Sequence, residues 1–118
     1  MSHLQLLEKP PLIPPRWIGK KALTIWYEHV DTLIEQGYTS DNDRCAFACY
    51  CEFAPLYRWA VNQAQRGYVS QRPTWAKIVE IYSSGPNIIA KRLPLPKLPP
   101  LDEAIRIIKE RKQCLRSR

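Results

Sequence analysis

The sequence predicts a small all-α protein with an antiparallel helical hairpin as its core. Apolar residues recur every three or four positions, turn and capping residues separate the apolar stripes, and 118 residues suffice for one modest core. Four segments follow from this pattern: an extended proline-rich arm (1–15), a helical core domain (16–92), a proline-rich connector (93–100) and a basic C-terminal helix (101–118). The core domain should hold the hairpin and a short third helix.

The arm ends in four prolines between positions 10 and 15, which remove backbone donors and push their neighbours out of the helical region. A stripe with helical spacing then predicts the first helix. Its members are Leu23, Trp26, Tyr27, Val30, Leu33 and Ile34. Gly37 should close this helix, because glycine readily adopts the positive φ of a helix C-terminus.

A polar run predicts the start of a second helix, with Thr39 or Ser40 as the N-cap and Asp43 completing the cap. Its apolar stripe is Phe47, Tyr50, Cys51, Ala54, Tyr57, Val61 and Ala64. The stripe ends before Gly67, and the short turn between the two helices predicts antiparallel packing. Pro55 lies inside the second helix and should kink it or divide it in two.

The pattern weakens after residue 69. A short third helix is expected to begin near Pro73 and to end at residues 83–86, Ser-Ser-Gly-Pro, and its apolar face is Trp75, Ile78, Val79 and Tyr82. Residues 87–93 could form a further helical turn or an extended stretch. The connector is polyproline-like and should separate modules. Asp102 can cap the last helix, whose apolar face is Ile105, Ile108 and Leu115.

No apolar run approaches the roughly 20 residues that span a bilayer, and the N-terminus lacks the pattern of an export signal. We therefore expect no membrane association and a cytoplasmic location. In that reducing compartment the four cysteines should be free thiols and small buried hydrophobes. Cys51 should point about 160° away from Cys49 on a helix, which argues against zinc. We expect no metal site.

The net charge of +7 is confined to the second half of the chain. Residues 1–68 hold seven Lys or Arg and seven Asp or Glu, whereas residues 69–118 hold eleven and four. A basic segment joined to a neutral packing module is typical of a protein that binds a polyanion. The alternative is a solvated surface that keeps the protein soluble.

The sequence lacks the patterns that catalysis would need. It has no phosphate-binding loop, and its four glycines leave little material for another one. Its acidic residues occupy capping positions or lie near basic ones, and His29 is the one histidine that could pack close to a cysteine. We expect no enzyme activity and no cofactor.

Aromatic residues on or beside the apolar stripes predict core or interface packing. Trp59 lies off the stripe, beside Arg58. It is expected to contact a partner, and a partner protein is expected in preference to DNA. The residues predicted at an oligomer or partner interface are Trp17, Trp26, Tyr57 and Trp59.

Several short motifs occur in a fixed order over about residues 14–68. A proline-rich arm leads to Pro15-Arg16-Trp17. The first predicted helix contains Trp26 and ends at Leu33-Ile34-Glu35-Gln36-Gly37. The next helix opens with Thr39-Ser40-Asp41-Asn42-Asp43 and contains Tyr50-Cys51-Glu52. This order resembles the small subunit of phage terminases.

The resemblance implies a ring-forming, non-catalytic protein that recognises viral double-stranded DNA. It implies that the partner is the large terminase subunit, which holds the ATPase and nuclease, and that the protein acts in the host cytoplasm. Under this hypothesis the phosphate contacts are Arg106, Lys109, Arg111, Lys112, Arg116 and Arg118, with Lys20 and Lys21 as a second patch.

Two other classes stay open. The chain could be a protein–protein adaptor whose proline segments, 9–15 and 93–100, dock on partners. It could also be a small helix-turn-helix regulator whose second helix reads DNA. The acidic start of that helix and its apolar stripe argue against the regulator.

Overall fold

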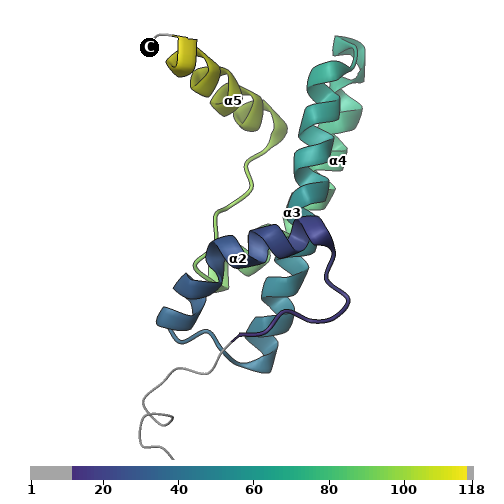
Figure 1. Ribbon diagram of the computed structural model, residues 1–118. Coiled ribbons are helices and arrows are strands. Elements are labelled where there is room, and N and C mark those ends of the chain that lie inside the picture. Colours follow the sequence, from purple (N-terminus) through teal and green to yellow (C-terminus); the bar gives the residue numbers. More distant parts are fainter. Residues whose placement is uncertain (1–11, 117–118) are drawn as a thin grey trace, which may run out of the picture.

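The computed structural model describes residues 12–116, with side chains to Cys114, and this part of the chain is helical apart from residues 12–19, residues 93–100 and short turns (Figure 1). The elements are α2 (Lys20–Glu35), α3 (Asp41–Arg66), the short 3-10 helix η1 (Val69–Gln71), α4 (Arg72–Arg92) and α5 (Leu101–Arg116). The all-α prediction is confirmed. Most of the predicted N-terminal arm and Arg118 lie outside the described residues, as do the side chains of Leu115 and Arg116.

The longest helix pair is formed by α3 and α4, which run side by side in opposite directions (Figure 1). α2 packs on the first half of α3 and lies across it. α5 packs on the second half of α3 and then diverges from the α3–α4 pair. The first two helices pack against each other with α2 across α3, and the antiparallel hairpin expected of them stays a prediction. α4 extends the core far beyond a short third helix.

Local signals set the turn between α2 and α3. Gly37 has a φ of 85°, and the N–H of Tyr38 donates to the Leu33 carbonyl at 2.9 Å, which is a Schellman ending. Ser40 then caps α3: its hydroxyl accepts from the Asp43 N–H at 3.1 Å, and the Asp43 carboxylate accepts from the Ser40 N–H at 3.4 Å. Both predicted signals are confirmed.

Prolines do not break the two long helices. α3 is one continuous helix through Pro55, so the predicted division does not occur. The prediction that α4 ends at residues 83–86 is wrong, because the helix continues to Arg92. The hydroxyl of Ser83 donates to the Glu80 carbonyl at 3.2 Å, and Pro86 is fully buried. Burial of the ring offsets the hydrogen bond that a proline removes from a helix.

Two apolar clusters form the core. The first joins α2 to the first half of α3 and has Trp26 stacked on Phe47, with ring centroids 4.4 Å apart. The second joins the rest of α3 to α4 and α5 and includes Tyr57 and Val79. Trp26 is 0% exposed and Tyr57 is 6% exposed, so their predicted place at an interface is wrong. The large apolar area that each would offer a partner is used within the chain.

The connector between α4 and α5 is part of the core. Leu93 and Leu95 are buried in the first cluster and Leu98 in the second. The hydroxyl of Tyr50 donates to the Pro96 carbonyl and that of Tyr57 to the Pro99 carbonyl, both at 2.5 Å. The segment has the predicted bounds, but the expectation that it separates modules is wrong.

Asn87 fastens the connector to α4. Its side-chain amide donates to the Leu98 carbonyl at 2.9 Å, and its side-chain oxygen accepts from the Leu98 N–H at 2.7 Å. Just beyond the connector, the first turns of α5 pack on the second cluster through Leu101, Ala104 and Ile105. The connector therefore sets the position of α5 on the core.

Candidate nucleic-acid interface

α5 diverges from the α3–α4 pair (Figure 1). A groove lies between α5, the end of α3 and the start of α4. Its volume is about 520 Å³. Its lining, which we call the basic groove, consists of Asn62, Gln65, Arg66, Arg72, Ile105, Lys109 and Lys112. Three helices thus contribute four cationic side chains, and no carboxylate lines the groove.

Helix packing places these cations. Ile105 is buried against α3, so Lys109 and Lys112, one and two turns further along α5, fall on the side that faces the groove. The Arg72 side chain is held by its Nε, which donates to the Ala64 carbonyl at 3.2 Å. Arg72 also begins α4, where the positive end of the helix dipole adds to the local potential.

The cations of the basic groove lack acidic partners. Within residues 12–116, Arg66, Arg72, Lys109 and Lys112 take part in no ion pair with an Asp or Glu side chain. Water and mobile anions must therefore screen their mutual repulsion. A polyanion that displaces those anions gains the entropy of their release.

A second groove lies on the other side of α5, and we call it the connector-side groove. Its lining is Tyr57, Arg58, Val61, Asn62, Lys97, Pro99, Ala104, Ile107, Ile108 and Arg111. Its cations come from α3, the connector and α5, and again no carboxylate lines it. Asn62 belongs to both grooves, so α5 forms a ridge between two adjoining basic surfaces.

The predicted phosphate contacts divide into two groups. Lys109, Lys112 and Arg111 line the two grooves. Arg106 lines an adjoining hollow, which it shares with Arg72 and Lys109 of the basic groove and with the carboxylates of Asp102 and Glu110. It forms ion pairs with Glu110 at 3.1 Å and Glu103 at 3.9 Å. Those carboxylates already neutralise its charge locally.

The other predicted contacts lie apart from the grooves. Lys20 and Lys21 are exposed in the first turn of α2, and Lys21 comes near Arg58 in a pocket between α2 and α3. Arg116 belongs to α5 by its backbone, but its side chain lies outside the described residues, as does all of Arg118.

Four cations that line the grooves were not predicted from the sequence: Arg58, Arg66, Arg72 and Lys97. A usable signal was present: the three arginines have no acidic residue three or four positions away, whereas Arg106 has Asp102, Glu103 and Glu110 at those spacings. This signal alone does not identify the groove, because Lys91 and Arg92 share it and line neither groove.

The cysteines show no sign of chemistry. Burial raises the pKa of Cys51 from 9.0 to about 12, with further contributions from the nearby charges of Glu52 and Glu28. Such a thiol is the reverse of an activated nucleophile. Cys45, Cys49 and Cys114 are exposed free thiols, so the expectation that the cysteines are buried hydrophobes holds for Cys51 alone.

Two aromatic residues predicted at an interface remain available for one. Trp17 is 62% exposed and Trp59 is 48% exposed. Trp59 meets Trp75 in an edge-to-face arrangement with ring centroids 5.6 Å apart. The T-shaped contact restricts the Trp59 ring to a fixed position on the surface.

Comparison with known proteins identifies no relative: no protein family, no curated protein and no solved structure matches this chain. In residues 12–116, no group of three His, Cys, Asp or Glu side chains is placed to hold a metal ion. Over the same residues, no helix is both long enough and apolar enough to cross a membrane.

Proposed function

We propose that this chain is a non-catalytic nucleic-acid-binding protein that contacts the phosphates of duplex DNA through the basic groove. The observation that supports this most directly is the convergence of Arg66, Arg72, Lys109 and Lys112 without a carboxylate among them. Phosphate contacts of this kind position a protein on DNA and provide most of its sequence-independent affinity.

Within that class, we propose the role of a phage terminase small subunit, which recognises viral DNA and presents it to the large subunit. The support is the order of motifs over residues 14–68, in which Gly37 ends one helix and Ser40 caps the next. These motifs lie in α2, in the first half of α3 and in the turn between them. The basic groove begins at the C-terminal end of α3.

The alternative of an adaptor that docks by its second proline segment fits the structure less well. The leucines of the connector are buried, and the carbonyls of Pro96 and Pro99 already accept hydrogen bonds from tyrosines. A polyproline ligand has to present its carbonyls and apolar side chains to its partner, and this segment directs its leucines and two of its carbonyls to its own core.

Neutralising the basic groove tests the DNA-binding proposal. The double substitution Lys109→Gln and Lys112→Gln should weaken binding to every duplex sequence and reduce the slope of log K against log salt by about 1.8, because each lost phosphate contact removes about 0.9. The measurement is fluorescence anisotropy with a labelled duplex at several salt concentrations.

The matched control for this test is Lys91→Gln with Arg92→Gln, which removes the same charge from exposed positions at the end of α4 that do not line the groove. The control should keep the wild-type slope. Equal losses in the two double variants would attribute binding to net charge alone and contradict the assignment of the groove.

A terminase small subunit should also assemble into a closed ring. Ile81 and Ile88 lie two turns apart on α4 and are more than 60% exposed, so they offer an apolar face to a second copy. Native mass spectrometry at micromolar concentration should show one closed oligomer, and Ile81→Asp should reduce it to monomer while Val69→Asp should not. A monomeric wild-type chain would rule out the ring, and failure to bind a large terminase subunit would rule out that partner.

A further inference from the structure

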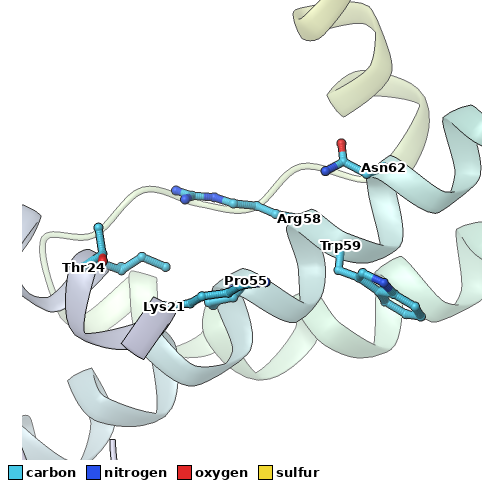
Figure 2. Close-up of a pocket in the computed structure, with 7 residues that line it drawn as sticks. Lys21, Thr24, Pro55, Arg58, Trp59 and Asn62 are labelled. Carbon is cyan, nitrogen blue, oxygen red and sulfur yellow. The ribbon is translucent and has the colours of Figure 1, made fainter. Parts of the chain in front are cut away.

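The pocket that holds Lys21 and Arg58 lies between α2 and α3, and we call it the α2–α3 pocket (Figure 2). Its volume is about 340 Å³. Its lining is Lys21, Thr24, Ile25, Pro55, Arg58, Trp59 and Asn62. Figure 2 shows Arg58 and Trp59 extending to opposite sides of the α3 surface that holds Pro55.

The lining of the α2–α3 pocket combines the groups that a nucleotide requires. Lys21 and Arg58 offer positive charge to a phosphate, Asn62 offers an amide donor and acceptor, and Trp59 offers an indole ring. No carboxylate lines the pocket. The edge contact with Trp75 holds the Trp59 ring in place, which lowers the entropy cost of stacking on it.

The pocket adjoins the two basic grooves. Asn62 lines the pocket and both grooves, and Arg58 lines the pocket and the connector-side groove. Arg58 and Arg66 are eight residues apart on α3, a rise of about 12 Å. A nucleic-acid backbone held in the grooves therefore passes the mouth of the pocket within a few nucleotides.

A base inside a duplex cannot stack on Trp59, because its neighbours in the helix cover both of its faces. An unpaired base is free to do so, and stacking on protein aromatics is a common way of binding single strands. We infer that the α2–α3 pocket binds an unpaired nucleotide of a single-stranded segment, with the base on Trp59 and the phosphate between Lys21 and Arg58. The inference rests on the proposed function, since it makes the pocket an extension of the duplex-binding grooves.

The test compares a labelled single-stranded oligothymidylate with a blunt duplex of the same length. Trp59→Leu should lower affinity for the single strand by roughly 5- to 150-fold, the effect of about 1 to 3 kcal/mol for one stacked base. Affinity for the duplex should not change. The matched control is Tyr27→Leu, which removes a more exposed aromatic (62% against 48%) from α2 outside the grooves and the pocket and should change neither affinity.

Trp59→Phe keeps an aromatic ring and guards against a folding defect. It should retain most of the single-strand affinity, and the quenching of tryptophan emission that the oligonucleotide causes in the wild type should be weaker in it, with Trp75 still beside the substituted ring. Unchanged single-strand affinity in Trp59→Leu, or quenching as strong in Trp59→Phe as in the wild type, would overturn the inference. If the Lys109 and Lys112 substitutions still weaken duplex binding, the proposed function stands without it. Binding of the single strand but not the duplex, with dependence on Trp59, would support the pocket and overturn the duplex proposal.

Discussion

Asn87 illustrates how much one polar side chain contributes to this fold. Both of its hydrogen bonds go to the backbone of Leu98, which is buried between α4 and α5. The backbone N–H and C=O of a buried residue need partners, and no sheet or helix supplies them in the connector. The side chain takes the place of a neighbouring strand.

Asn87→Leu should therefore destabilise the protein by about 1 to 3 kcal/mol, because it leaves a donor and an acceptor of Leu98 unsatisfied. Urea unfolding followed by circular dichroism measures this loss. Asn42→Ala, at an exposed position of α3, is the control and should change stability by less than about 0.5 kcal/mol. Similar losses in the two variants would show that the bond pair is unimportant.

The two tyrosines that hold the connector make stability depend on alkaline pH. Burial raises the pKa of Tyr50 and of Tyr57 from 10.0 to about 12, and the charges of Cys51 and Glu103 respectively raise it further. The folded state thus favours the protonated phenols. Their contribution to stability is complete below pH 10 and is lost as the pH rises through about 12.

Unfolding free energy should accordingly fall between pH 10 and about 12. The variant Tyr50→Phe with Tyr57→Phe should be less stable at pH 8 but should lose less stability over the alkaline range. Urea titrations at stepped pH provide the measurement, and parallel pH profiles for the variant and the wild type would contradict the assignment. The Cys51 thiol, whose pKa is also raised, contributes to the slope in both proteins.

At the scale of helices, the predictions that succeeded rested on local chemistry. The Gly37 ending and the Ser40 cap are determined by residues within one turn of each other, and the stripe of α3 is buried throughout as the periodicity predicts. The predicted end of α4 failed because Pro86 is stabilised by distant packing partners, which local propensity does not reveal.

Two glycines in this fold should respond in opposite ways to the same substitution. Gly37→Ala places a side chain at a φ of 85° and should destabilise the protein by about 1 to 2 kcal/mol. Gly85→Ala lies inside α4 with open space around it and should stabilise by about 0.5 to 1 kcal/mol. Thermal unfolding of both variants tests this, and loss of stability in Gly85→Ala would contradict a helix that continues past residue 85.

At the scale of the whole molecule, the basic surfaces are assembled from distant parts of the chain. The count of charges places the excess after residue 68, yet Arg58 and Arg66 come from the neutral half. Lys109, Arg111 and Lys112 were predictable from the sequence because they share one helix. Their neighbours on α3 and α4 were not, since these cations come close to those of α5 only when α5 packs on the α3–α4 pair.

The buried connector limits how the protein can be dissected. Leu93 and Leu95 complete the cluster around Trp26 and Phe47, far from the cations of α5. A chain cut after α4 would lose part of both apolar clusters together with its basic helix, and its failure to bind DNA would report misfolding as readily as a lost contact. Domain deletion, the usual first experiment on a basic tail, is therefore unsuitable here, and the interface has to be mapped by single side chains in the intact chain.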